Sequence, residues 1–176
     1  MNAEQPENAE LHEFMAQLNR QHQRDEQHVT EQHLVTHSED AHWLEGTTDN
    51  PSHLGLLLHL PMKTVEIVLQ MIPAGTATDL QRHVHESVHY VTEGAGWSEI
   101  GDQVVQWEQG DFVFTPPWIW HRHYAGTQNV RMVIIENSRV LNALDADLRE
   151  SRGSIGYAEA FGRSAARPTE PDEESA

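Results

Sequence analysis

Nine short runs of apolar and β-branched residues, separated by turns rich in glycine, proline and aspartate, follow one another between residues 54 and 136. Runs of about four to eight such residues between turn signals are typical of β-strands. A series of short strands without intervening helices packs as a sandwich or a barrel, and closure of the sheets leaves few strand edges exposed. The runs are 54–60, 65–72, 81–85, 87–92, 97–100, 103–107, 112–117, 120–125 and 130–136. We therefore predict an all-β fold for this part of the chain.

The segments on either side of these runs have a different character. Residues 9–22 carry one apolar stripe at helical spacing, which predicts an amphipathic helix. The stripe consists of Leu11, Phe14, Met15 and Leu18. Residues 140–149 predict a short helix, and the residues after it have the composition of a disordered acidic tail. We therefore divide the chain into a helical or extended arm, 1–50, a barrel, 51–140, and a C-terminal helix with an acidic tail, 141–176.

Charge and composition exclude several classes of function. The formal net charge of −17 disfavours a protein that binds nucleic acid through its phosphates or docks on an anionic membrane. The chain has no cysteine, which excludes disulfides and thiolate metal sites. Its first residues lack the features of a signal peptide, and no apolar run approaches the roughly 18 residues that span a bilayer. We expect a cytoplasmic protein that binds neither nucleic acid nor membranes.

Histidine is the residue type in excess, with 13 in the chain. Alternate side chains of a strand share a face, so Gln81, His83 and His85 point the same way if their strand is unbroken. Imidazoles on one face can chelate Fe, Zn, Cu or Ni, and the run at 120–125 supplies His121 and His123 as further ligands. The same pattern also fits histidines that only form hydrogen bonds inside a barrel. The residues alone leave these two interpretations open.

Two stretches of this region resemble the paired motifs of the cupin superfamily. The first is Gly75-x5-Gln81-x-His83, followed by Tyr90-Val91-Thr92-Glu93-Gly94. The second runs from Gly110-Asp111-Phe112 to Pro116-Pro117-Trp118-x-Trp120-His121, and it is similar to the corresponding motif of gentisate 1,2-dioxygenases and related ring-cleaving cupins. The resemblance covers about residues 65–136. It implies a single double-stranded β-helix, or jelly-roll, barrel that uses Fe(II) and O2 to open a dihydroxylated aromatic ring.

The first motif departs from the family pattern at one position, and the departure depends on register. Counted from Gly75, the two histidines of the family fall on Gln81 and His83, and the glutamate of many other cupins falls on Ser87. A shifted register makes His83 and His85 the pair and places His89 at the glutamate position. We favour the first register, in which an amide replaces one of three imidazoles. The metal ligands that the resemblance implies are therefore His121 and His83, with His85 and Gln81 open.

The same resemblance implies a pocket for a small phenolic substrate next to the metal. Tyr90, Trp118 and Trp120 are candidates for its aromatic walls, and His123 is a candidate for orienting a ligand or for acting as an acid or base. Each of these side chains fits an ordinary position in the barrel core or rim equally well. No residue is assigned as a catalytic acid or base.

The altered first motif also resembles the small subunit of two-component hydroquinone 1,2-dioxygenases, in which a larger cupin subunit holds the working iron. This hypothesis predicts a hetero-oligomer, and the long N-terminal arm is compatible with a homo-oligomer as well. Two other classes remain open. One is a non-catalytic cupin that binds a small molecule, and the other is a cupin isomerase or lyase, which ranks lower because Ser87 replaces the motif glutamate.

Overall fold

The computed structural model describes residues 12, 13, 15, 16 and 34–162. The chain divides into two units, Met1–Leu34 and Val35–Ala176, and the second contains the β-structure. His12, Glu13, Met15 and Ala16 are helical, whereas the rest of the predicted amphipathic helix lies outside the described residues, as does most of the predicted acidic tail. No helix in the described part is long and apolar enough to cross a membrane.

Six strands form the first antiparallel sheet, in the order β1-β2-β3-β10-β5-β8. They are β1 (His42–Leu44), β2 (His53–Leu56), β3 (Glu66–Ile72), β10 (Val130–Glu136), β5 (Ser87–Glu93) and β8 (Phe112–Thr115). The central strand β10 pairs with β3 on one side and with β5 on the other, so residues that are far apart in the sequence lie next to one another in this sheet.

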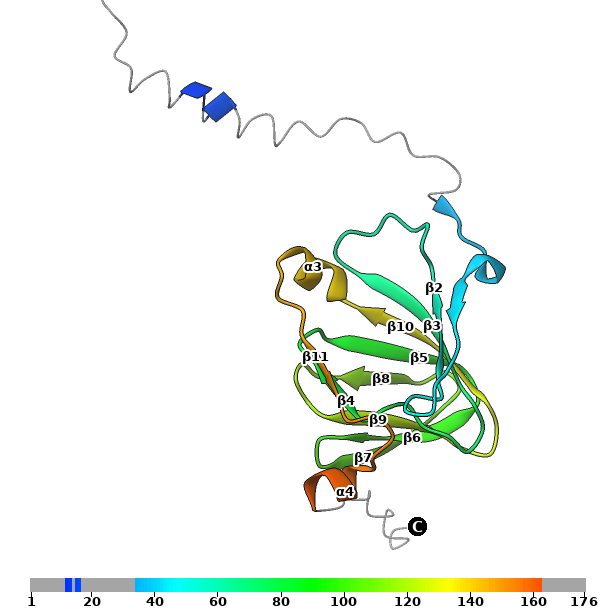
Figure 1. Ribbon diagram of the computed structural model, residues 1–176. Helices are drawn as coiled ribbons and strands as arrows, with labels where there is room; N and C mark the ends of the chain where they lie inside the picture. Colours follow the sequence, from blue (N-terminus) through cyan, green and yellow to red (C-terminus); the bar gives the residue numbers. More distant parts are fainter. Residues whose placement is uncertain (1–11, 14, 17–33, 163–176) are drawn as a thin grey trace, which may run out of the picture. The chain divides into compact units, whose positions relative to one another are not determined.

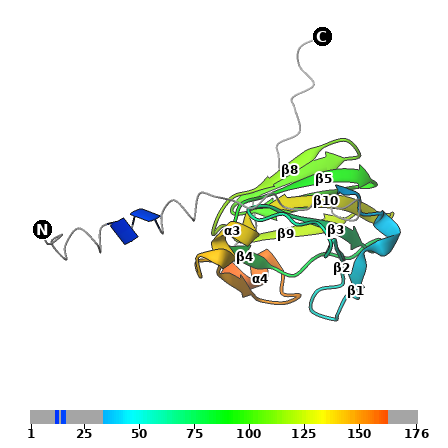
Figure 2. The same ribbon diagram turned by 90° about the horizontal axis from the view of Figure 1, so that it is seen from above.

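The second antiparallel sheet has five strands in the order β11-β4-β9-β6-β7. They are β11 (Arg149–Ser151), β4 (Gln81–His83), β9 (His121–Ala125), β6 (Ala95–Ile100) and β7 (Gln103–Glu108). Figure 1 shows this sheet facing β3, β10, β5 and β8, and Figure 2 gives the same two layers from above. The predicted all-β jelly-roll barrel is confirmed, and the structure builds it from two antiparallel sheets with only a few short helices.

The ends of the domain differ in detail from the predicted boundaries. Residues 42–44, which we expected within the N-terminal arm, pair with β2 as the edge strand β1. The C-terminal helix is α3 (Ser138–Ala143), shorter than expected. After it the chain returns to the barrel as β11 and then forms α4 (Tyr157–Phe161). A short 3₁₀-helix, η1 (Ser38–Asp40), precedes β1.

One end of the space between the sheets is filled by an apolar core. Because inward-facing residues alternate along each strand, Ile72, Val91 and Met132 from three neighbouring strands meet there. The full cluster is Ile72, Val91, Trp107, Val113, Ala125, Val130 and Met132. Gly96 permits the close approach of β9, since a Cβ at this position would overlap the Tyr124 carbonyl and the Trp107 ring. Towards the other end the inward-facing residues become polar.

The C-terminal segment is fixed to the outer side of the second sheet by Arg122. Its Nε donates to the carbonyl of Thr78 at 2.8 Å, and its Nη1 donates to the carbonyls of Ser154 and Ile155 at 2.9 and 3.0 Å. Arg122 is 9% exposed, so these carbonyls satisfy a largely buried guanidinium. This attachment follows β11 directly in the chain and therefore helps to hold β11 against β4.

Candidate functional site

The polar end of the barrel contains a cavity of about 470 Å³. One wall is apolar and consists of Leu54, Leu56, Val68 and Ile134. The rest of the lining is polar and consists of Asn50, Glu66, Gln70, Gln81, His83, His85, Ser87, His89, Glu136 and Arg149. A cavity with an apolar wall and a few converging polar groups is the usual form of a small-molecule site.

Strand alternation explains why most of these side chains point into the cavity. On β3, Val68 and Gln70 face inward in line with Ile72 of the core, and on β10 Ile134 and Glu136 continue the row that begins with Met132. Ser87 and His89 occupy the corresponding positions of β5, before Val91. The same strands therefore supply the core at one end and the cavity at the other.

His83 and His121 lie edge to face, with their ring centroids 4.7 Å apart. Nδ1 of His83 is 2.7 Å from the carbonyl oxygen of His85, and Nδ1 of His121 is 2.8 Å from that of Ile119. Because a carbonyl only accepts, both Nδ1 atoms carry the proton, and both Nε2 atoms keep a free lone pair. Burial lowers the pKa of both rings, and neighbouring histidines lower it further. Both are therefore neutral imidazoles with a nitrogen available for a ligand.

His85 is held by two carboxylates. Its Nδ1 is 2.8 Å from Oδ1 of Asp147, and its Nε2 is 3.4 Å from Oε2 of Glu136. Burial lowers the pKa of His85, but the hydrogen bonds to the two carboxylates outweigh it, so the pKa is raised overall. His85 stacks on His83 at 3.7 Å between centroids. Both ring nitrogens of His85 face carboxylates, and the raised pKa favours the protonated form over the neutral form that binds a metal.

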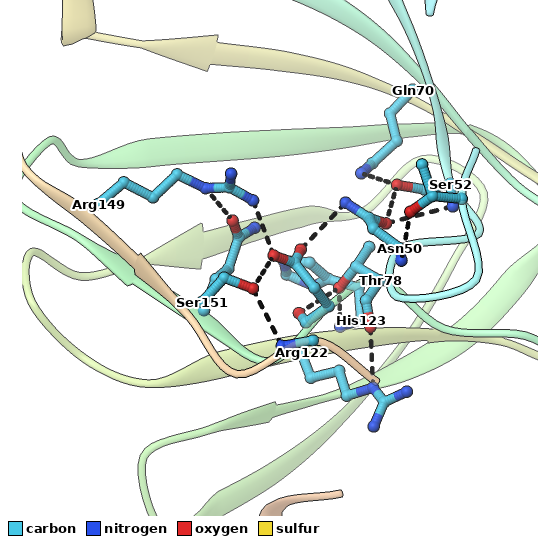
Figure 3. Close-up of polar contacts among 12 residues, drawn as sticks. Asn50, Ser52, Gln70, Thr78, Arg122, His123, Arg149 and Ser151 are labelled. Atoms are coloured by element: carbon cyan, nitrogen blue, oxygen red, sulfur yellow. Dashed lines mark hydrogen bonds and ion pairs between the residues drawn. The ribbon is translucent and has the colours of Figure 1, made fainter. Parts of the chain in front are cut away.

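Gln81 lies opposite His121 in the pairing of β4 with β9, and its side-chain oxygen is occupied. Nε of Arg149 donates to Oε1 of Gln81 at 2.7 Å, and Nη2 of the same arginine lies 2.8 Å from Oδ2 of Asp79. Arg149 and Ser151 reach the Asp79 carboxylate from β11, and Asn50 reaches it from the other side (Figure 3). The amide at the altered motif position therefore binds a guanidinium of the chain itself.

A second pair of histidines lies deeper in the barrel. His89 and His123 have their ring centroids 4.4 Å apart. Ser98 Oγ accepts a hydrogen bond from the Trp107 indole at 2.8 Å and contacts Nδ1 of His123 at 2.7 Å. Burial is the main cause that lowers the pKa of His123 and brings that of His89 to about 3. Both rings are therefore neutral, and His89 lines the cavity whereas His123 does not.

The other three predicted pocket residues, all aromatic, do not line this cavity either. The Tyr90 ring packs on Phe112 at 4.7 Å, on the outer face of the first sheet. Trp118 and Trp120 lie outside the second sheet, with the Arg82 guanidinium 4.3 and 4.8 Å from their ring centroids. The reason is alternation, because Tyr90 follows the inward-facing His89, and Trp120 precedes the inward-facing His121.

Among the charged residues at the site that the sequence analysis missed are Glu136, Asp147 and Arg149. Glu136 ends β10 facing the cavity, and its acidic character in an otherwise apolar run was a usable signal. Asp147 and Arg149 lie beyond the second motif, at the end of the stretch 140–149 that the sequence predicts to be helical. They reach the site only because the chain returns after α3 to pair β11 with β4. No local pattern predicts that return.

The iron that the resemblance to ring-cleaving cupins implies is held by three imidazoles, and among the candidate ligands of the two motifs only His83 and His121 are neutral imidazoles with a free nitrogen. His83 and His121 fit, since each has a free Nε2, and that of His121 is buried without a partner. Gln81 and His85 do not fit, because one is bound to Arg149 and the other to two carboxylates. In the part of the chain that the structure describes, no three histidine, aspartate or glutamate side chains are arranged around a common metal position.

Comparison with known proteins agrees with the fold. Residues 68–136 match the sequence profile of the family described as Cupin domain. Gentisate 1,2 dioxygenase 1 of Aquipseudomonas alcaligenes is 36% identical over 56 residues, which are 31% of this chain and 16% of that protein.

Two solved structures of salicylate 1,2-dioxygenase from Pseudoaminobacter salicylatoxidans, both in complex with gentisate, are also similar. A tryptophan-to-tyrosine mutant aligns with a TM-score of 0.50 and 26% identity over 52% of this chain and 25% of that chain. A glycine-to-alanine mutant aligns with a TM-score of 0.55 and 21% identity over 62% and 31%, which supports the fold alone. This chain spans less than a third of the length of each of these relatives. The chain therefore contains a cupin domain, which is distantly related to the gentisate and salicylate 1,2-dioxygenases.

Proposed function

We propose that this chain is a cupin subunit of an aromatic ring-cleavage dioxygenase of the hydroquinone or gentisate type. In this proposal it is the small subunit of a two-component enzyme, and a larger cupin subunit holds the Fe(II) that reacts with O2. The observation that carries the proposal is the bond between Gln81 and Arg149, which removes the third ligand from a site that otherwise keeps two imidazoles. The reaction class in this proposal rests on the distant similarity to the gentisate and salicylate 1,2-dioxygenases.

The residues of this chain then bind and orient a phenolic ring instead of activating oxygen. The apolar wall of the cavity, which includes Leu56 and Ile134, suits the face of an aromatic ring. Gln70 is 5% exposed, and its buried Oε1 has no hydrogen-bond partner among the described residues. A buried acceptor of this kind costs free energy until a donor reaches it, and a phenolic hydroxyl is such a donor.

An exposed apolar surface supports the partner in this proposal. Phe112, Phe114 and Ile135 are 69%, 50% and 42% exposed on the outer face of the first sheet. Phe114 lies opposite Val88, which in turn lies opposite Ile135, so the apolar residues form rows across β8, β5 and β10. Contiguous apolar surface of this kind on a folded domain marks an interaction site.

If the larger subunit holds the iron, the isolated chain and the two-subunit complex should differ in iron content and in O2 uptake. The chain alone is expected to carry substoichiometric iron and to consume no O2 with hydroquinone or gentisate, because only two of the three motif ligands are imidazoles with a free nitrogen. Co-production with a larger cupin chain of the same genome is expected to give O2 uptake with one of these substrates. Metal analysis and an oxygen electrode measure both quantities. Full iron loading and ring cleavage by the isolated chain would contradict the proposal.

A charge on the apolar face is expected to weaken the complex. Phe114→Lys places an ammonium in a surface that association would dehydrate, so we expect the Kd for the larger subunit to rise about 10- to 100-fold. Leu144→Lys is the matched control, since Leu144 is 69% exposed and lies after α3. Size-exclusion chromatography and calorimetry compare the two variants. Equal effects of both substitutions would show that the partner binds elsewhere.

A second candidate function is a non-catalytic cupin that binds a small aromatic molecule. The incomplete metal site among the described residues favours it, because binding in the cavity needs no metal. The two candidates differ in one result. Ligand binding by the isolated chain, with no O2 uptake in any combination of subunits, would identify the binding protein and exclude the dioxygenase subunit.

A further inference from the structure

Arg149 presents a guanidinium to the cavity in a fixed orientation. It lines the cavity from β11, and it contacts Gln81 through Nε at 2.7 Å and Asp79 through Nη2 at 2.8 Å. Two fixed contacts on adjacent nitrogens determine both the position and the plane of the group. A guanidinium has five N–H donors, so at least three remain after these two bonds.

Asp79 acts as the anchor that holds this arginine. It is 3% exposed, and its carboxylate also accepts hydrogen bonds from Ser151 Oγ at 2.6 Å and from Asn50 Nδ2 at 3.0 Å. Figure 3 shows these contacts converging from β11 and from the loop before β2. The carboxylate lies on the Nη2 side of the guanidinium, and Nη1 has no hydrogen-bond partner among the described residues.

The other charged groups around the cavity are already paired. Glu136 and Asp147 both contact His85, at 3.4 and 2.8 Å. Glu66 lies 3.4 Å from Arg139 Nη2 and accepts a hydrogen bond from Ser138 at 3.1 Å. Among the described lining residues, Arg149 is thus the cation that keeps N–H donors without a partner. Its side chain is 51% exposed, so a ligand can reach these donors.

We propose that Arg149 is the fixed cation of this cavity and binds the carboxylate of a small aromatic acid there. The arginine lies beside Gln81, the residue at the position where the motif of the relatives has a metal ligand. Gln81 takes part as the acceptor that orients the arginine. Guanidinium and carboxylate form short, directional, charge-assisted hydrogen bonds, and the ring of the acid would lie on the apolar wall formed by residues such as Leu56 and Ile134. The inference rests on the proposed use of the cavity for an aromatic ligand and specifies the chemical class of that ligand.

The test compares two probes of the same shape on the full chain without any partner. Isothermal titration calorimetry with 2,5-dihydroxybenzoate (gentisate) and 2,5-dihydroxybenzamide compares a carboxylate with a neutral amide of nearly the same shape. We expect the acid to bind about 10- to 100-fold more tightly than the amide, the range for a hydrogen-bonded charge. Arg149→Gln is expected to abolish this preference, Arg149→Lys to retain part of it, and Arg131→Gln to leave it unchanged. Arg131 is the control because it pairs with Glu93 outside the cavity.

Several results would overturn the inference. Equal affinity of the wild-type chain for the two probes would exclude a fixed cation, and this comparison does not depend on the folding of any variant. A preference that survives in folded Arg149→Gln would assign the carboxylate to another residue. Absence of binding by both probes would also reject it. None of these results bears on O2 uptake by the two-subunit complex, so failure of this inference is separable from failure of the proposed function.

Discussion

Replacing Asp79 by asparagine is expected to lower the free energy of unfolding by about 3 kcal/mol, as for other broken buried ion pairs and hydrogen-bond networks. Oδ1 of Asp79 accepts from Asn50, and Oδ2 accepts from both Arg149 and Ser151. An asparagine at this position would turn one acceptor into a donor. In either orientation of the amide, its NH2 group would face a donor, and Arg149 would lose its counter-charge.

The experiment is urea unfolding of the wild type, Asp79→Asn and the control Asp102→Asn. Asp102 is exposed and accepts one hydrogen bond, from the neighbouring Gln103, so its substitution is expected to change stability by less than about 0.5 kcal/mol. For a domain of this size, the loss at Asp79 corresponds to a fall in Tm of roughly 6–12 °C. A loss below about 1 kcal/mol for Asp79→Asn would show that the Asp79–Arg149–Ser151 contacts do not persist in solution.

Most of the barrel could be predicted because its signals are local. Each of the nine predicted runs corresponds to one of the strands β2 to β10, and the turns between them use residues suited to sharp reversals. Gly94, Gly101 and Gly110 adopt positive φ angles of 86°, 60° and 100° at these turns, a conformation that glycine adopts without strain. β11 is the exception, since all three of its residues are exposed and only pairing with β4 makes it a strand.

The candidate site was predictable in part, for physical reasons that differ between its residues. His83 was found because a motif marks it, and it lines the cavity. Tyr90 and Trp120 do not line the cavity, because strand alternation places them on the outer faces of their sheets, and aromatic character alone does not indicate which face a residue occupies. Asp147 and Arg149 act through contacts with residues more than sixty positions away in the chain, and no local pattern encodes such contacts.

The second large predicted effect is on metal affinity, and it follows from the bond between Gln81 and Arg149. Gln81→His alone supplies a third imidazole next to His83 and His121, but it leaves the Arg149 guanidinium beside the new ligand. A divalent cation at that position is repelled by the arginine and gains less than the ligand count implies. We therefore expect the single variant to bind Co(II) less than about tenfold more tightly than the wild type.

Removing the arginine as well is expected to give the full gain in Co(II) affinity from the third imidazole. Structural zinc sites with four ligands bind with about 10–16 kcal/mol, or roughly 3 kcal/mol for each ligand, so Gln81→His combined with Arg149→Gln is expected to raise Co(II) affinity by about 100-fold. Arg149→Gln alone is the control, since it removes the charge without adding a ligand. Calorimetry and the visible spectrum of bound Co(II) measure affinity and ligand set separately. If the single variant already gains the full affinity, Arg149 does not oppose the metal, and the loss of one imidazole alone accounts for the altered site.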